Sequence, residues 1–147
     1  MPVRLATDAD VELLATLRRT WVEEDGPVDE PLFEQEFADW YAAEAHQRTT
    51  WIGFADTVPV GMLNLLEFRR MPRPGRLRSG WGYISNVFVL AEHRNRGLGK
   101  DLLDAAIATA KERGYARLVL SPTERARPFY GRAGFAVADE LVLLSLG

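Results

Sequence analysis

The apolar residues in the first half of the chain follow helix-like spacing in some stretches and strand-like composition in others. Residues 11–21 and 32–41 carry apolar side chains every three or four positions, which is the spacing of one helix face. Thr7 and Asp8, which can cap a helix, precede the first run, and a proline that the first turn of a helix tolerates precedes the second. Strands are predicted where β-branched and large apolar residues gather, at 2–6, 50–55 and 58–68, the last two as a hairpin.

The second half predicts strands that alternate with helices. Residues 83–90 form an apolar run typical of a buried strand, and residues 97–113 predict a helix that Gly114 closes. The inner face of that helix is predicted to consist of Leu98, Leu102, Leu103, Ala106 and Ala110. Shorter elements follow, namely a strand at 117–120, a helix at 124–132 and one or two closing strands at 136–146.

Composition excludes several classes of protein. The chain has 147 residues, 47% hydrophobic and 27% charged, which fits one domain with its own core over residues 1–147. It has no cysteine and two isolated histidines, so a disulfide framework and a catalytic thiol are excluded and no metal site is expected. No run approaches the roughly 18–20 apolar residues of a membrane span, so we expect a cytoplasmic protein without a membrane partner.

Charge is distributed unevenly along the chain. Residues 20–47 contain no lysine or arginine but nine carboxylates, Glu23, Glu24, Asp25, Asp29, Glu30, Glu34, Glu36, Asp39 and Glu44. Residues 69–78 reverse the sign, with five arginines interleaved with proline and glycine, which predicts an exposed, mobile loop. The net charge of −3 argues against direct binding of nucleic acid.

Residues 84–103 have the order of a phosphate site: a strand, a charged turn with two glycines, and a helix. The first backbone N–H groups of a helix have no partner inside it and carry partial positive charge, so together they hold an anion. Glycines let phosphate oxygens approach the backbone, and cationic side chains add charge. The residues concerned are Arg94, Arg96, Gly97, Gly99 and Lys100. Taken alone, the turn also fits a tight strand-to-helix connection that binds nothing.

A second motif narrows the kind of phosphate compound. Residues 123–135 read TERARPFYGRAGF and residues 87–99 read VFVLAEHRNRGLG. Together, and in this order, they resemble the GNAT superfamily of acetyl-CoA-dependent N-acetyltransferases. The resemblance covers nearly the whole chain and is sharpest over residues 83–135. A Rossmann turn does not fit, because Leu102 stands where its third glycine would be.

The resemblance implies both a fold and a co-substrate. The fold is α/β, a central and mostly antiparallel mixed sheet flanked by four helices, splayed around residues 87–89 to admit acetyl-CoA. Val87, Phe88 and Val89 would offer backbone groups to the pantetheine arm, and a backbone N–H near Val87 would polarise the thioester carbonyl. The pyrophosphate would be wrapped by Arg94, Asn95, Arg96, Gly97, Leu98, Gly99 and Lys100.

Two further positions carry cofactor and acid roles in the family. Tyr130 stands where many relatives have the tyrosine that donates a proton to the departing CoA thiolate, and a phenol is a neutral donor at pH 7. A core aromatic residue beside Phe129 and Phe135 is the alternative. Thr123 replaces the asparagine that commonly contacts the cofactor, so a hydroxyl remains there with less reach.

The general base is not evident. Ser85 stands where relatives often have a carboxylate, and a serine hydroxyl is no base near neutral pH without an activating partner. The candidates are Glu67, acting through a water, or one of Glu23, Glu24 and Asp25. A water relay that delivers the proton to bulk solvent is the other possibility.

The acceptor is expected to be an amine. The first two helices usually border the acceptor in this family and here carry the acidic stretch, which favours a cationic primary amine, either a small molecule or a peptide. The arginines of 69–78 leave open an anionic acceptor or binding of the CoA 3′-phosphate. A non-catalytic acyl-CoA-binding or regulatory domain is the alternative function. The apolar stretch 141–146 predicts pairing with a second subunit in a homodimer.

Overall fold

The computed structural model describes residues 2–147 and contains a five-stranded sheet. Its strands lie side by side in chain order: β1 (Val3–Leu5), β2 (Arg48–Ala55), β3 (Val58–Arg69), β4 (Gly80–Val89) and β5 (Leu118–Val119). Neighbours from β1 to β4 pair antiparallel, whereas β4 and β5 pair parallel. The prediction of a mixed, mostly antiparallel sheet is confirmed.

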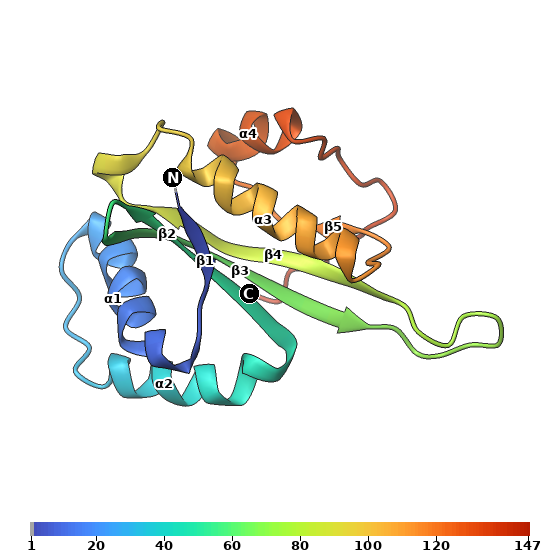
Figure 1. Cartoon of the computed structure of the whole chain (residues 1–147), viewed down its shortest axis with the longest axis horizontal. Coiled ribbons are helices and arrows are strands. Elements are labelled where there is room, and N and C mark those ends of the chain that lie inside the picture. Colours follow the sequence, from blue (N-terminus) through green and yellow to red (C-terminus); the bar gives the residue numbers. More distant parts are fainter. Residues whose placement is uncertain (1) are drawn as a thin grey trace.

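Helices cover both faces of the sheet (Figure 1). On one face lie α1 (Val11–Val22) and α2 (Phe33–Glu44), and over the other lie α3 (Leu98–Glu112) and α4 (Arg127–Arg132). Single 3-10 turns complete the connections: η1 (Asp8–Asp10), η2 (Glu23–Asp25), η3 (Ala45–Gln47), η4 (Ala91–His93) and η5 (Glu124–Ala126). No helix within residues 2–147 has the length and apolar character needed to cross a membrane.

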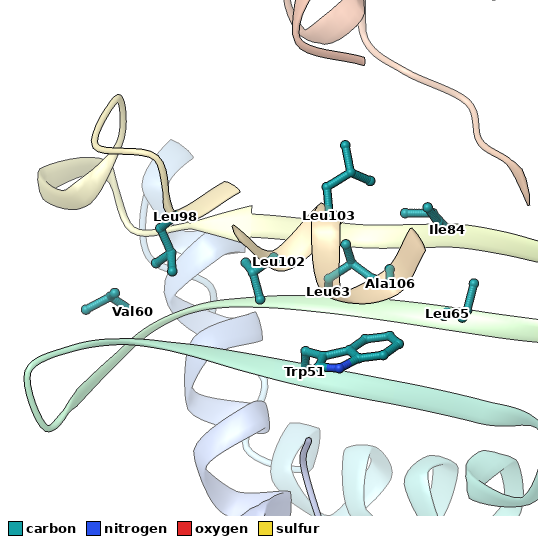
Figure 2. Packing of buried hydrophobic residues seen from close by; sticks show 9 residues of the cluster. All are labelled: Trp51, Val60, Leu63, Leu65, Ile84, Leu98, Leu102, Leu103 and Ala106. Atoms are coloured by element: carbon teal, nitrogen blue, oxygen red, sulfur yellow. The ribbon is translucent and has the colours of Figure 1, made fainter. Parts of the chain in front are cut away.

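Each face of the sheet has its own core, because successive side chains of a strand point to opposite sides. Leu63 and Leu65 of β3 pack under α3, in the cluster that Figure 2 shows between that helix and the strands. Met62 points the other way and packs with α1. The buried side chains of α3 are the five that its spacing predicted, Leu98, Leu102, Leu103, Ala106 and Ala110.

The first turn of α3 sits close to the sheet because glycines lie under it. A Cβ atom added to Gly53 of β2 would lie 2.6 Å from Leu98 Cδ1, and one added to Gly61 of β3 would lie 2.9 Å from the carbonyl oxygen of Phe88. Neither strand leaves room for a larger residue at these positions. The N-terminus of α3 is therefore held against the sheet beside the end of β4.

β4 is distorted at its centre by a bulge. Asn64 of β3 pairs with Ser85, but Met62 pairs with Phe88, so β4 has one residue more than β3 across this interval. Asn86 takes up the extra length in the left-handed region at φ 53°. On the other side of β4, pairing with β5 covers only Gly82 and Tyr83 within the described chain. β4 thus continues past β5 with that edge unpaired in the described chain, as the splay predicted around residues 87–89 would require.

The C-terminal segment differs from expectation, whereas the arginine-rich segment is exposed as predicted. The predicted closing strands are absent, since residues 136–147 contain no strand and Val142, Leu143, Leu144 and Leu146 are 80–100% exposed. An apolar run becomes a strand only where a neighbour pairs with its backbone, and this segment does not pair with β5. The arginine-rich stretch is exposed, as predicted, and forms the tip of the β3–β4 hairpin, which is closed by two hydrogen bonds between Arg73 and Arg76 of 3.1 and 2.9 Å.

Candidate active site

The turn before α3 presents free backbone donors. Gly97 adopts φ 88° and Asn95 adopts φ 62°, so the chain reverses sharply before the helix starts. The N–H of Asp101 donates to the carbonyl oxygen of Gly97 at 3.0 Å, which is the first bond of the helical ladder. The three preceding N–H groups, those of Leu98, Gly99 and Lys100, therefore have no helical partner and are available to an anion.

The cationic side chains of the turn are not equally available. The Arg94 guanidinium donates to the Val89 carbonyl oxygen at 2.8 Å and to both carboxylate oxygens of Glu24 at 2.8 Å. It therefore ties η2 to the turn instead of projecting toward a ligand. Lys100 pairs with Asp104 on its own helix at 2.6 Å, whereas Arg96 is exposed and forms no ion pair with any residue of 2–147.

The edge of β4 beside this turn has backbone N–H and C=O groups available for binding, whereas its side chains pack in the two cores. Phe88 is buried in the core under α1, and Val87 and Val89 pack on the α3 side. The edge that faces β5 carries no ladder beyond Tyr83 within the described residues. An unpaired strand edge binds an extended ligand through alternating N–H and C=O groups. The backbone edge of residues 87–89 is therefore unpaired toward β5 in the described chain, and its binding of a pantetheine arm stays a prediction.

Tyr130 lies on α4, which packs on the beginning of α3. Its ring meets Phe129 and Phe135 edge to face, with centroids 5.0 and 5.8 Å apart. A Cβ atom added to Gly99 would lie 3.5 Å from Phe129 Cζ, which brings α4 against the free end of α3. Burial raises the pKa of the Tyr130 hydroxyl above its usual value, so the phenol stays protonated at neutral pH.

Thr123 has a structural task. Its Oγ1 accepts a hydrogen bond from the Ala126 N–H at 3.2 Å and thereby caps η5, the turn that leads into α4. The hydroxyl hydrogen remains free to donate, but the oxygen is directed at the protein backbone. The cap holds the start of the α4 segment in place.

A cavity of about 630 Å³ opens on the opposite face of the sheet, under α1 and α2. One wall is apolar and aromatic, formed by Leu14, Phe33, Phe37, Trp40, Tyr41, Met62 and Leu66. Polar groups face it from Arg18, Glu36, Arg48, Thr50, Asn64, Tyr83, Ser85 and Asn86. Because Ser85 and Asn86 form the bulge of β4, the cavity reaches the part of the strand whose edge toward β5 is unpaired in the described chain. Its size suits a small molecule or one side chain.

The acidic stretch contributes little to this cavity. Of the nine carboxylates in residues 20–47, Glu36 is the one that lines it in the described structure. Others stabilise the fold: Glu34 pairs with Arg19 and Glu44 pairs with Arg48, each at 2.8 Å. The negative charge that suggested a cationic acceptor is therefore largely neutralised or directed elsewhere.

Glu67 lies away from the cavity. It points to the α3 side of β3, where its carboxylate accepts a hydrogen bond of 2.6 Å from the Tyr115 hydroxyl. Burial, and then this bond to Glu67, raise the pKa of the Tyr115 phenol. The other carboxylates considered as a base, Glu23, Glu24 and Asp25, do not line the cavity either. Glu67 therefore lies on the opposite face of the sheet from the cavity that Ser85 and Asn86 line.

Sequence reasoning missed several residues of the cavity, namely Arg18, Asn64 and Tyr83. The Tyr83 hydroxyl donates to Ser121 Oγ at 3.2 Å, which joins β4 to the segment after β5. The signal available was alternation: Met62, Asn64 and Leu66 share one face of β3, and Tyr83 and Ser85 share one face of β4. This alternation predicts which residues share a face of the sheet. It does not predict which face borders the cavity, because that depends on where α1 and α2 pack.

Known proteins resemble this chain at the level of both sequence and fold. The model of the acetyltransferase (GNAT) family matches residues 12–135. The chain is 30% identical over 87 residues to glucosamine 6-phosphate N-acetyltransferase of Trypanosoma brucei brucei, which covers 59% of this chain and 57% of that protein. It spans about half the length of the first curated relatives that it matches.

Solved structures match over almost the full length. A GCN5-related N-acetyltransferase from Ralstonia eutropha JMP134 aligns with a TM-score of 0.74 at 28% identity, covering 99% of both chains. A predicted acetyltransferase from Clostridium acetobutylicum, in a crystal structure with acetyl-CoA, aligns with a TM-score of 0.78 at 22% identity, covering 98% of this chain and 95% of that one. By its sequence match and its fold, the chain belongs to the GNAT family of acetyltransferases.

Proposed function

We propose that this protein is an N-acetyltransferase that transfers the acetyl group of acetyl-CoA to a primary amine. The observation that carries the proposal is the position of the β4 bulge. On one side of it lie an unpaired strand edge and the free N–H groups of α3, and on the other side lies the cavity under α1 and α2. A thioester and an amine bound on the two sides would meet at Ser85 and Asn86.

Acetyl-CoA suits the groups on the cofactor side. The N–H groups of Leu98, Gly99 and Lys100, with the exposed Arg96, would hold its diphosphate. The edge of residues 87–89 would pair with the amide groups of its pantetheine arm, as an added strand does. The proposal takes support from the relative that crystallised with acetyl-CoA. The arginine-rich hairpin does not serve the CoA 3′-phosphate, since it projects from the opposite end of the sheet (Figure 1).

The reaction would proceed by direct attack in a ternary complex. The amine nitrogen forms a bond to the thioester carbon, the backbone N–H near Val87 stabilises the oxyanion, and the C–S bond then breaks. The Tyr130 phenol donates its proton to the departing thiolate and regains one from solvent. The chain contains no cysteine, so no cysteinyl acyl-enzyme can form.

The amine must lose its proton before attack. Because Glu67 is engaged with Tyr115 on the other face of the sheet, we propose that the proton passes to water in the cavity and on to bulk solvent. Ser85 does not accept it, since its hydroxyl donates to Asn86 Oδ1 at 3.1 Å and forms no hydrogen bond with a basic side chain within residues 2–147.

Turnover of the thioester tests the proposal. Acetyl-CoA is incubated with a mixture of amines, release of free thiol is recorded, and the acetylated product is identified by mass spectrometry. Tyr130→Phe is expected to lower kcat by about 100-fold, the lower end of the range for general-acid catalysis, while leaving the Kd for CoA unchanged. Tight binding of CoA without turnover would support the alternative, a non-catalytic acyl-CoA-binding or regulatory domain.

We also propose that the protein forms a homodimer through its C-terminal segment. Val142, Leu143, Leu144 and Leu146 leave an apolar run in solvent, and β5 is the last strand of the sheet, with its outer edge unpaired in the described chain. If the C-terminal segment of a second copy pairs with the outer edge of β5, the apolar side chains are buried and the strand edge gains hydrogen bonds.

Light scattering tests the dimer. The unmodified protein is expected to have the mass of a dimer at micromolar concentration, and Leu143→Glu is expected to halve it. Leu77→Glu changes another exposed leucine, 72% accessible in the β3–β4 hairpin, and is expected to remain a dimer. A monomeric mass for the unmodified protein would reject the proposal, as would a dimer that survives Leu143→Glu.

A further inference from the structure

One arginine in the wall of the cavity has no counter-ion. Arg18 projects from α1, is partly buried, and lines the cavity with Leu14, which lies one turn earlier on the helix. Within residues 2–147 it forms no ion pair, whereas its neighbour Arg19 pairs with Glu34 and Arg94 pairs with Glu24. A partly buried guanidinium without a carboxylate is costly unless a ligand or water satisfies its donors.

Aromatic stacking fixes the position of this guanidinium. Its carbon Cζ lies 4.6 Å from the centroid of the Trp21 ring. Trp21 in turn stacks on Phe88, with centroids 5.0 Å apart and planes inclined by 14°. Phe88 belongs to β4 and follows the bulge by two residues. Arg18 is thus braced through two rings against the strand where the reaction would occur, and stacking leaves its N–H groups free to donate.

The other charged groups of the cavity do not cancel Arg18. Arg48 is neutralised by Glu44 at 2.8 Å, donates to Asn64 Oδ1 at 3.3 Å, and stacks over Trp40. Glu36 is exposed and forms no ion pair within residues 2–147. The uncompensated charges are therefore one cation fixed in the wall and one solvated carboxylate.

We infer that the acceptor carries an anionic oxygen group, a carboxylate or a phosphate, in addition to its reacting amine, and that Arg18 binds that group. The inference rests on the proposed function and specifies its substrate class. The planar guanidinium presents paired N–H donors that match two oxygens of such a group. The aromatic side chains around the cavity lower the local dielectric constant and so strengthen such a contact. The acceptor is then an amine at one end and an anion at the other, instead of a purely cationic molecule.

Matched pairs of amines test this inference. One pair is 4-aminobutyrate and its amide, a second is 2-aminoethyl phosphate and 2-aminoethanol, and α-amino acids with their amides extend the set. Diamines and polyamines form the cationic arm. Comparison of the carboxylate compounds with the phosphate compound shows which of the two anionic groups Arg18 binds. For each compound kcat and KM are measured with the unmodified protein and with Arg18→Gln, Arg18→Lys, Glu36→Gln and Arg76→Gln.

The anionic member of at least one pair is expected to be preferred. Arg18→Gln should raise its KM and lower kcat/KM by roughly 10- to 100-fold, the effect of losing a charge-assisted hydrogen bond, without affecting its neutral partner. Arg18→Lys should recover part of the loss, and Glu36→Gln should favour the anionic member further by removing a like charge. Arg76→Gln alters an exposed arginine of the remote hairpin and should change nothing.

Two other outcomes would overturn the inference in distinguishable ways. If cationic amines are preferred, and Glu36→Gln instead of Arg18→Gln weakens their use, the protein is an acetyltransferase but the substrate class is wrong. If acetyl-CoA binds and no amine of any arm is acetylated, the proposed function fails and the inference fails with it.

Discussion

Replacing Gly97 by alanine tests whether the turn before α3 binds an anion, provided that the effect on ligand affinity is distinguished from the effect on stability. Gly97 has φ 88°, and Gly114, at the other end of the same helix, has φ 69°. An added Cβ meets nothing within 4 Å at either position, so an alanine there costs backbone strain alone. That strain is about 1–2 kcal/mol for an L-residue in the left-handed region. Gly114→Ala is therefore a matched control for Gly97→Ala.

Both variants are expected to lose stability to a similar extent. For a chain of this length about 1 kcal/mol corresponds to roughly 2–4 °C in Tm, so each variant should melt roughly 2–8 °C lower in a thermal scan followed by circular dichroism. Only Gly97 borders the free N–H groups of Leu98, Gly99 and Lys100. A methyl group in the open space beside it obstructs a diphosphate and displaces these donors.

Calorimetric titration with acetyl-CoA then distinguishes the two ends of the helix. Loss of one charge-assisted hydrogen bond costs about 1.5–3 kcal/mol, so Gly97→Ala should raise the Kd by roughly 10- to 100-fold. Gly114→Ala should bind as the unmodified protein does. Equal affinities in the two variants, whether both normal or both reduced, would refute the assignment of the turn as the diphosphate site.

Three further predictions concern the core, the ion pairs and the proton. Gly61→Ala places a Cβ 2.9 Å from the Phe88 carbonyl oxygen of β4, and Gly80→Ala places one 2.9 Å from the Phe68 carbonyl oxygen of β3, at the far end of these strands. Both variants should cost about 1–3 kcal/mol of stability, but only Gly61→Ala should also weaken CoA binding in the same titration. Hydrogen bonds from Arg4 lower the pKa of Asp10 to about 2, so its ionised form stabilises the fold above about pH 4 and this contribution is lost as the pH falls toward 2. Asp10→Asn should accordingly lower the free energy of unfolding by about 2 kcal/mol at pH 7, with the difference from the unmodified protein vanishing near pH 2 in urea titrations. If water takes the amine proton, the pH profile of kcat/KM should move with the pKa of whichever acceptor is used; a limb that stays fixed between two acceptors would indicate a base on the protein.

Local periodicity was sufficient to predict the helices of this fold. The inner face of α3 was predicted residue by residue because a helix on a flat sheet buries one stripe, and five apolar residues recur at that spacing. The turn before α3 was equally accessible, since a glycine between strand and helix predicts a positive φ, and Gly97 has one. These features depend on residues that are close in sequence.

Features that depend on pairing between distant segments were not accessible. The bulge at Asn86 exists only relative to the register of β3, and the bond between Arg94 and Glu24 joins positions 70 residues apart. Glu67 was a candidate base because the sequence predicts that it lies on the strand next to β4. The sequence does not predict which face of the sheet borders the acceptor. The closing strand failed for the same reason: residues 136–146 have strand-like composition but no partner to pair with.

The bulge also determines which mutations β4 can accept. Substitution of Asn86 by another residue that tolerates a positive φ would leave the bulge in place, whereas deletion of this one codon would remove the bulge and keep Phe88 opposite Met62. Phe88 would then remain in the core under α1, and Val87 and Val89 would remain on the α3 side. The fold of β4 can therefore accept the loss of this one residue. In a mutant library, the single-codon deletion at Asn86 should be retained under selection for folding alone and lost under selection for acetyl transfer, which is proposed to occur at the bulge.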